Sequence, residues 1–219
     1  MTRILILGAT GRTGAAILRA LPADVQVTAA LRDPADTGRL ARTAASLEHA
    51  VVDLASTNSL RQAMDGVGVV VNAIRLREDI APTELIAVHE RLRSTGGDTQ
   101  EDVPRIVTVG GAGALRLPDG ARFWQSPAFP QTTLPRGRAH AALRDHLEAG
   151  NAGDAWAYLI PPPAYDPDGS ATGRWERVPP AKDETSFTVR AISYADFGAA
   201  VAEVAAGVDT GTQLIAWPR

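Results

Sequence analysis

Short apolar runs alternate with longer segments of helical spacing along most of this sequence. The first run is apolar at every position, as expected for a strand that is covered on both faces. The pattern predicts strands at Ile4–Leu7, Val25–Leu31, His49–Val52, Val67–Ala73, Arg105–Val109, Ala155–Ile160 and Gln213–Trp217. It predicts helices at Thr13–Leu21, Arg39–Leu47, Thr57–Met64, Pro82–Arg93, Arg136–Ala149 and Tyr194–Ala206. This alternation indicates an α/β fold, a Rossmann-like doubly wound parallel sheet with helices on both faces.

The region after Ile160 breaks this pattern. Prolines at 161–163 and 179–180 bracket a loop that contains Gly and Asp, with small strands expected at Arg174–Val178 and Phe187–Arg190. We expect residues 161–190, together with the long loop 115–134, to form a small substrate cap. The cap is too short to fold alone, so residues 1–219 are predicted to be a single Rossmann-like domain.

Composition excludes several classes of protein. The chain has 219 residues, no cysteine and a formal net charge of −3. Thiol catalysis, disulfides and zinc-thiolate sites are therefore absent, and the charge argues against a nucleic-acid partner. No run of ~18 apolar residues predicts a membrane helix, and the first apolar run is too short for a signal peptide. We expect a cytoplasmic protein, a monomer or homodimer, that acts on a small molecule.

Three glycines directly after the first strand form the strongest motif. Gly8, Gly11 and Gly14 are spaced GxxGxxG and lead into the first helix. In that context glycines permit a tight turn and a close approach of the backbone to a pyrophosphate, and the helix N-terminus offers amide N–H groups. The alternative is a glycine-rich turn without a ligand. The spacing differs from the commoner GxGxxG and does not choose between cofactors.

Charged residues after the second and third strands bear on which nucleotide is bound. Asp33 lies near the position of the acidic group of an NAD site, but Arg32 precedes it. Arg32 and Arg12 together would flank a 2′-phosphate, so we expect NADPH, with NADH as the other possibility. The alternative is that both arginines are surface charges. Asp53 either accepts a hydrogen bond from the adenine amino group or caps the following helix.

At these residues the sequence resembles a known family. The glycine turn, Leu31–Pro34, Val71–Ala73 and above all Arg105–Leu115 carry the resemblance, and the last is similar to a segment RVVVVGGAGSL. The sequence thereby resembles the atypical short-chain dehydrogenase/reductases, and within them the NmrA-like, NAD(P)H-binding group of NADH-flavin reductases. The resemblance runs nearly end to end. It is specific for fold and cofactor class and much looser for substrate.

The resemblance implies a cofactor at the C-terminal edge of the strands. The residues that it implies around the pyrophosphate are Gly8, Thr10, Gly11, Arg12, Thr13 and Gly14. It further implies Arg32 at the 2′-phosphate, Asn72, Ala73 and Ile74 on the nicotinamide-ribose side, and Gly110 and Gly111 beneath the nicotinamide. Ala114 departs from the family, which often has serine there, and this removes one hydroxyl near the substrate.

The Ser–Tyr–Lys set of the larger dehydrogenase family is missing. Arg136 stands where the tyrosine of YxxxK would be and His140 where the lysine would be, and glycine replaces the serine. A flavin or quinone tolerates this loss, because hydride reduces it to a delocalised anion that water can protonate. His140 is the remaining candidate for a catalytic acid or a ribose contact, and its unperturbed pKa of about 6.5 suits proton transfer. The alternative is a surface histidine.

Aromatic residues gather in the long loop and in the cap. Phe123, Trp124 and Phe129 lie in the loop and Tyr165 in the cap, so we predict that they cover a flat acceptor. The alternative is that they anchor the loop to the body of the protein.

The function predicted first is an NADPH-dependent oxidoreductase that passes hydride to a planar conjugated acceptor such as a flavin or quinone. Two alternatives remain open. One is an NmrA-like sensor that binds NAD(P) without catalysis. The other is a reductase or isomerase specific for an aromatic metabolite.

Overall fold

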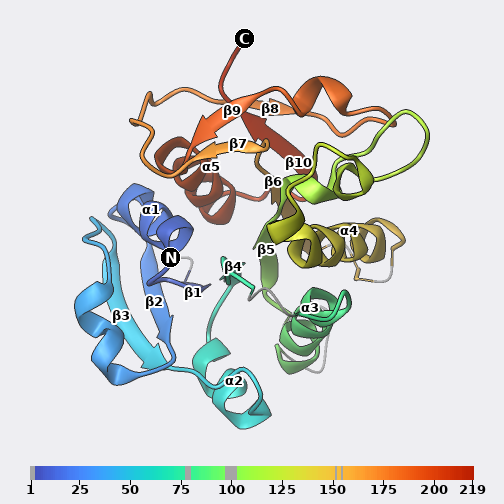
Figure 1. Cartoon of the computed structure of the whole chain (residues 1–219). Helices are drawn as coiled ribbons and strands as arrows, with labels where there is room; N and C mark the ends of the chain where they lie inside the picture. Colours follow the sequence, from blue (N-terminus) through green and yellow to red (C-terminus); the bar gives the residue numbers. More distant parts are fainter. Residues whose placement is uncertain (1–2, 77–79, 97–102, 151, 154) are drawn as a thin grey trace.

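A computed structural model describes residues 3–76, 80–96, 103–150, 152–153 and 155–219. Within them one sheet has the strand order β3-β2-β1-β4-β5-β6-β10-β8, and Figure 1 shows it in the middle of the molecule. Its strands are β1 (Arg3–Leu7), β2 (Gln26–Leu31), β3 (Ser46–Val51), β4 (Val69–Asn72), β5 (Arg105–Val109), β6 (Trp156–Ile160), β8 (Glu176–Val178) and β10 (Gly211–Ala216). All neighbours are parallel except β8, which pairs antiparallel with β10. The predicted doubly wound sheet is confirmed.

Helices cover both faces of this sheet (Figure 1). The helices α1 (Arg12–Ala20) and α5 (Tyr194–Ala206) pack on one face, and α2 (Thr57–Met64), α3 (Glu84–Thr95) and α4 (Leu134–Glu148) pack on the other. The alternation of side chains along β1 explains the two cores. Ile4 and Ile6 lie in the core under α1 and α5, whereas Leu5 and Leu7 lie in the core under α2 and α3.

The helices α1 and α5 approach each other closely because small residues meet there. A Cβ added at Gly198 of α5 would lie 2.5 Å from the Cβ of Ala16 of α1. Glycine is therefore required at this crossing. The close packing fixes the helix that follows the glycine turn against the C-terminal helix.

The edge of the sheet at β3 corrects one prediction. The helix predicted at Arg39–Leu47 is wrong, because the chain forms a 3-10 turn at Pro34–Arg39 and then extends into β3 from Ser46. Strand β3 is mostly exposed, with Val51 51% exposed, so it lacks the apolar signal of a buried strand. Its hydrogen bonds to β2 define it, and these bonds depend on tertiary structure.

The C-terminal part contains a second, two-stranded sheet of β7 (Ala164–Asp166) and β9 (Ala191–Ser193), which are parallel. The strand predicted at Arg174–Val178 is confirmed as β8. The strand predicted at Phe187–Arg190 is wrong, because Thr185–Phe187 form a 3-10 turn and the strand begins at Ala191. Phe187 is buried there as a core side chain, so its apolar character reports packing and not strand structure.

None of the helices in the described ranges is long and apolar enough to span a membrane. The same residues contain no group of three or more His, Asp or Glu side chains arranged to hold a metal ion.

Candidate functional site

The glycine turn follows β1, and the strand order reverses there because β1 pairs with β2 on one side and with β4 on the other. Gly8 has a φ of +80°, and a Cβ there would lie 2.6 Å from the carbonyl oxygen of Ala73. A Cβ on Gly14 would lie 2.2 Å from the carbonyl oxygen of Gly8. The Gly11 N–H donates to that same oxygen at 2.9 Å. The turn therefore closes on itself, and only glycine fits at Gly8 and Gly14.

A cavity of about 650 Å³ opens beside this turn. It runs from the ends of β1 and β2 to the residues after β4 and the start of α4. The residues that line it are Leu7, Gly8, Thr10, Gly11, Ala30, Leu31, Arg32, Asp36, Arg39, Val52, Leu54, Ala73, Ile74, Arg75, Leu76 and Arg136. The cavity thus unites Gly8, Thr10, Gly11, Arg32, Ala73 and Ile74, which were predicted from the sequence as cofactor contacts. Its volume lies in the usual range for ligand sites.

The β2 end of the cavity carries two arginines, and they are not the pair that the sequence predicted. Arg32 follows β2 and is exposed, and Arg39 of the 3-10 turn lies beside it in the cavity lining, bonded to Asp36 at 2.7 Å. Arg12 instead lines a second cavity of about 630 Å³ between α1, α5 and residues 167–175. Arg39 was missed because a helix was expected there. The turn signal Asp33-Pro34 would have indicated its position.

Asp53 and Asn72 hold the backbone near the cavity. An Asp53 oxygen accepts the Ala55 N–H at 2.9 Å, and Ser56 is the residue that caps α2. Asp53 therefore shapes the turn before α2, although it is not the helix cap itself, and neither Asp53 nor Asn72 lines the cavity. Asn72 is buried, and its side-chain oxygen accepts the Ile74 N–H at 3.3 Å. It thereby positions Ile74, which does line the cavity.

Gly110 and Gly111 follow β5 and pack on two rings. A Cβ on Gly110 would lie 2.9 Å from Cζ of Tyr158, and a Cβ on Gly111 would lie 2.6 Å from Cδ2 of His140. Neither glycine lines the cavity in this structure. The double glycine therefore lets the chain after β5 cross directly over the Tyr158 and His140 side chains.

Half-buried His140 and fully buried Tyr158 form a pair beneath these glycines. The Tyr158 hydroxyl donates to the carbonyl oxygen of His140 at 3.2 Å, so its oxygen accepts the Nδ1–H of His140 at 3.0 Å. Desolvation, helped by Arg136, lowers the pKa of His140 to about 4. Burial raises the pKa of Tyr158. His140 is therefore a neutral donor to tyrosine at neutral pH, and its predicted role as a catalytic acid is not favoured by this geometry.

The loop aromatics contact the protein itself. Phe123 and Phe129 are buried and meet edge to face, with ring centroids 5.5 Å apart. Trp124 lies 5.0 Å under the Arg138 guanidinium, and a Cβ on Gly137 would meet both Phe129 and Trp124. None of the three lines either of the two cavities described above. These contacts match the alternative that the aromatics anchor the loop to α4.

Tyr165 of β7 joins the C-terminal part to the glycine turn. Its hydroxyl lies 3.1 Å from the hydroxyl of Thr13 in α1, and its ring stacks on Tyr194 with centroids 3.8 Å apart. Burial raises the pKa of Tyr165, so it stays protonated. The Thr13 hydroxyl, predicted as a pyrophosphate contact, is thus bonded to Tyr165 in this structure.

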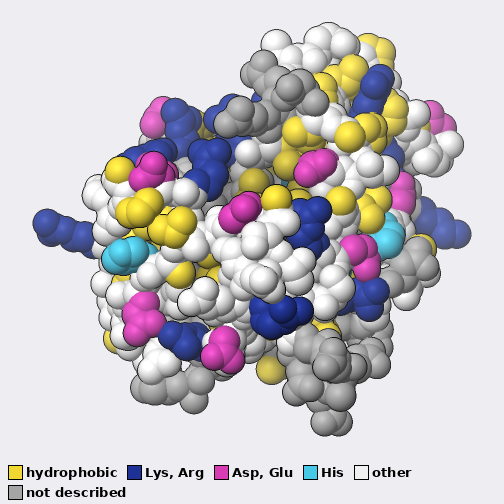
Figure 2. Space-filling view, turned by 90° about the horizontal axis from the view of Figure 1, so that it is seen from below, with side chains coloured by type: hydrophobic (Ala, Val, Ile, Leu, Met, Phe, Trp, Pro, Cys, Tyr) yellow, Lys and Arg dark blue, Asp and Glu magenta, His cyan; other side chains and the backbone are white. Residues whose placement is uncertain are grey.

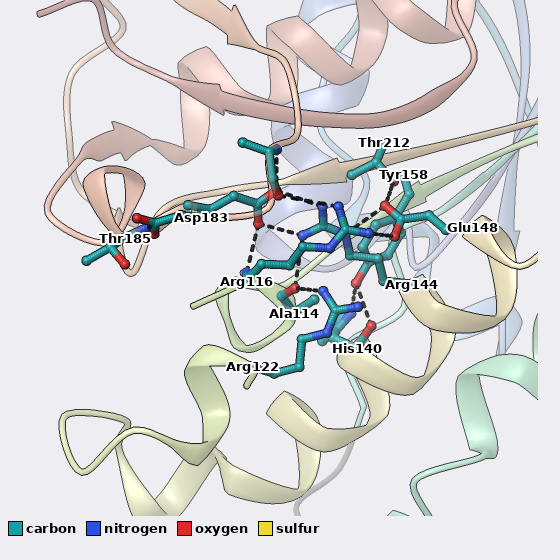
Figure 3. A network of polar contacts seen from close by, with 12 residues as sticks. Ala114, Arg116, Arg122, His140, Arg144, Glu148, Tyr158, Asp183, Thr185 and Thr212 are labelled. Atoms are coloured by element: carbon teal, nitrogen blue, oxygen red, sulfur yellow. Dashed lines mark hydrogen bonds and ion pairs between the residues drawn. The ribbon is translucent and has the colours of Figure 1, made fainter. Parts of the chain in front are cut away.

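A buried ionic network fixes the chain after β5, and sequence reasoning missed it. Arg144 of α4 is fully buried and bonds Glu184 through two contacts of 2.7 Å each. Its Nε donates to Glu148 at 2.9 Å, and it also donates to the carbonyl oxygen of Ala114 at 3.0 Å. Figure 3 shows Arg122 and Arg144 both pointing toward Ala114. Burial alone would lower the pKa of Arg144, but its bonds to Glu184 and Glu148 raise it.

This network joins four segments that are distant in sequence. Arg116, after β5, donates its backbone N–H to Glu184 at 2.8 Å and pairs through its side chain with Glu148 (Figure 3). Thr212 of β10 donates to Glu148 at 2.8 Å. Charge-assisted hydrogen bonds therefore hold together the segments 112–116, α4, 181–184 and the start of β10.

Comparison with protein families yields a match over most of the chain. The sequence model of a family described as NAD(P)H-binding matches residues 8–207. The uncharacterized protein YwnB of Bacillus subtilis is 28% identical over 209 residues, which cover 91% of this chain and 90% of YwnB.

Solved structures share the fold over the whole chain. A proposed NADH-flavin reductase from Streptococcus pneumoniae has a TM-score of 0.75 at 23% identity, with 100% of both chains covered. A proposed epimerase from Bacteroides thetaiotaomicron has a TM-score of 0.79 at 23% identity, with 100% of this chain and 98% of that chain covered. At these identities the likeness concerns the fold.

Proposed function

Because this chain belongs to the NAD(P)H-binding family, we propose that it is an NADPH-dependent oxidoreductase that passes hydride to a planar conjugated acceptor such as a flavin or quinone. The observation that carries the proposal is the cavity at the switch point of the sheet, with Arg32 and Arg39 at one end and Ile74 and Leu76 at the other. We also propose that the protein is cytoplasmic and works as a monomer or homodimer.

The residues of the cavity fit a nicotinamide dinucleotide. The turn at Gly8–Gly14 leaves no room for a Cβ at its two ends, so its backbone can approach a pyrophosphate closely. Arg32 and Arg39 would hold a 2′-phosphate by paired hydrogen bonds. Ala73 and Ile74 would line the nicotinamide-ribose side. When bound, the reduced nicotinamide supplies the hydride that the reaction needs.

The groups near the β4 end favour an acceptor that needs no strong acid. Arg136 lines the cavity where a tyrosine would stand in the larger dehydrogenase family, and a guanidinium does not give up its proton. His140 is neutral at neutral pH, because desolvation lowers its pKa to about 4. The apolar side chains of Ile74 and Leu76 suit contact with a flat ring. Positioning of two reactants is then the main contribution of the protein.

The surface supports a small-molecule partner. Over the described part of the face seen in Figure 2, Lys and Arg side chains are interspersed with Asp and Glu. A nucleic-acid footprint would instead require basic side chains that gather along one face.

The cofactor preference is tested with Arg32→Ala. The variant should weaken NADPH binding by roughly 10- to 100-fold and leave NADH binding nearly unchanged, since one charge-assisted contact is worth about 1.5–3 kcal/mol. Calorimetric titration with both nucleotides measures this. Arg42→Ala is the matched control, because Arg42 is exposed and lies outside the cavity. Equal loss for both nucleotides would contradict the 2′-phosphate role of Arg32.

The reaction is tested by NADPH oxidation with FMN, riboflavin and menadione, followed at the nicotinamide absorbance band. Sustained turnover with any of these acceptors supports the oxidoreductase. Tight nucleotide binding without oxidation across the panel would instead favour the NAD(P) sensor.

A further inference from the structure

The end of the cavity that lies away from Arg32 and Arg39 also carries two arginines. Arg75 follows β4, and Arg136 lies in the first turn of α4. Strand β4 lies on the opposite side of β1 from β2, and α4 packs over β6 and β10 still further along the sheet. The two pairs of arginines therefore lie on opposite sides of the glycine turn, and one phosphate group cannot bind both.

The position of Arg136 is electrostatically unfavourable without an anion. The N-terminal end of a helix carries a partial positive charge, and a cation in the first turn is repelled by it. The first turn of α4 has no acidic residue to offset this repulsion. Among the described residues no carboxylate lies within ion-pair distance of Arg75 or Arg136. A charge held in an unfavourable position, such as this cation at a helix N-terminus, is expected at a functional site.

The dinucleotide itself does not account for these charges. Backbone N–H groups of the turn serve the pyrophosphate, and Arg32 and Arg39 serve the 2′-phosphate. Among the described residues that line the cavity, four arginines stand against a single carboxylate, Asp36, which is already paired with Arg39. Of these described charges, Arg75 and Arg136 therefore remain beside the apolar wall of Ile74 and Leu76, where the acceptor would lie.

We propose that the acceptor is anionic, with a phosphate, carboxylate or sulfonate group bound by Arg136 and Arg75 while its planar ring packs on Ile74 and Leu76. This inference rests on the proposed function, since it names the substrate class of the same cavity. Guanidinium groups bind such anions through paired hydrogen bonds, so the anion also fixes the orientation of the ring. Neutral rings of the same shape bind without this anchor.

FMN and riboflavin provide the test, because they share one ring system and differ in a phosphate. Protein saturated with NADP⁺ is dialysed to equilibrium against each flavin, and bound flavin is measured by absorbance. We expect FMN to bind at least about tenfold more tightly than riboflavin at low salt, and the difference to shrink as salt is added. Equal binding of the two flavins, or binding of neither, would overturn the proposal.

Arg136→Gln identifies the group responsible. The variant should lose most of the preference for FMN while it keeps its affinity for NADP⁺ and for riboflavin. Arg138→Gln is the matched control, because Arg138 lies on the same helix and stacks on Trp124 outside the cavity. A preference for FMN that survives in Arg136→Gln and in Arg75→Gln overturns the proposal.

Failure of the two proposals gives different results. If the protein oxidises NADPH with riboflavin and menadione as readily as with FMN, the oxidoreductase stands and the anionic acceptor is overturned. If FMN is preferred through Arg136 but NADPH is not oxidised, the anion site is supported and the oxidoreductase is contradicted.

Discussion

The turn after β1 and the segment after β5 are both glycine-rich, but different forces hold them in place. After β1 the backbone packs on itself, so that a Cβ at Gly14 would meet the carbonyl oxygen of Gly8. After β5 the backbone packs on the side chains of Tyr158 and His140, and Arg144 bonds the carbonyl oxygen of Ala114. The first region is specified by neighbours in sequence and by the backbone of Ala73 against Gly8, and the second by residues on α4, β6 and the loop at 181–184.

This difference teaches how each region responds to change. A local turn tolerates changes elsewhere in the chain but not an added methyl group at its own glycines. A segment held by distant partners tolerates local changes better and fails when a partner is lost. Substitutions in the two regions should therefore separate loss of stability from loss of cofactor binding.

The largest effect is expected from Glu184→Gln. The substitution leaves the Arg144 guanidinium buried without its main carboxylate partner, which costs about 3–5 kcal/mol in comparable buried pairs. The free energy of unfolding, measured by urea titration, should fall by that amount. The control is Glu203→Gln, because Glu203 pairs with Arg177 at the exposed surface and such pairs contribute about 0–1 kcal/mol. A loss in Glu184→Gln no larger than in this control would show that the network does not hold the β5 segment.

Gly14→Ala tests the other region. The added methyl would lie 2.2 Å from the Gly8 oxygen and distort the turn, at an expected cost of about 1–3 kcal/mol. Alanine is the better helix former by about 0.8–1 kcal/mol, so helix propensity cannot explain a loss. NADPH affinity, measured by calorimetry, should fall by more than about tenfold, because the pyrophosphate contacts depend on the turn. Glu184→Gln protein that remains folded should bind NADPH more tightly than Gly14→Ala protein.

Gly38→Ala is the matched control for this substitution. A Cβ there would meet nothing within 4 Å, and Gly38 lies next to Arg39 near the same cavity. NADPH affinity in Gly38→Ala should remain close to that of the unmodified protein. An equal loss in both variants would contradict the close packing of the turn.

Near neutral pH the smallest effect is a dependence of stability on pH, and it belongs to the β5 side of the molecule. Burial lowers the pKa of His140 to about 4, and burial likewise lowers that of His89 on α3 to about 4. In the unfolded chain each histidine gains its proton near pH 6.5. Above pH 6.5 both histidines are neutral in the folded and the unfolded protein, so protonation of the unfolded chain takes nothing from the free energy of unfolding. The free energy of unfolding falls as the pH drops from 6.5 toward 4, by up to about 1.4 kcal/mol per pH unit for each histidine.

Urea titrations between pH 7 and pH 5 measure this slope, and the upper part of the range avoids most carboxylate protonation. His140→Gln should remove the contribution of one of the two histidines, so the slope of the unfolding free energy against pH should fall by about half. An unchanged slope in this variant would contradict the desolvation of His140 beneath Gly111.

The sequence predicted most of the β1 region because its causes are local. The apolar run before Gly8 and the helical spacing after Gly14 lie within about twenty residues, and glycine spacing reports backbone geometry directly. The parallel sheet followed from the alternation of strands and helices. Arg32 lines the cavity, as expected for a residue that directly follows a buried strand, and its contact with a 2′-phosphate stays a prediction.

The remainder depends on contacts that sequence patterns do not encode. Arg144 and Glu184 are forty residues apart, and each looks like an ordinary surface charge. Strand β3 is an exposed edge strand, so its pattern was ambiguous and Arg39 was assigned to a helix. Phe123 and Phe129 were predicted at the acceptor because an aromatic loop has the same composition whether it packs on the protein or on a ligand.

The hydrogen bond between Thr13 and Tyr165 makes the C-terminal segment a thermodynamic partner of the glycine turn. Any ligand that stabilises the first turn of α1 also favours the arrangement in which β7 is attached to it. By reciprocity, any change that orders the C-terminal segment through β7 stabilises the first turn of α1 by the same free energy. Thr13→Val would uncouple the two segments without removing either of them.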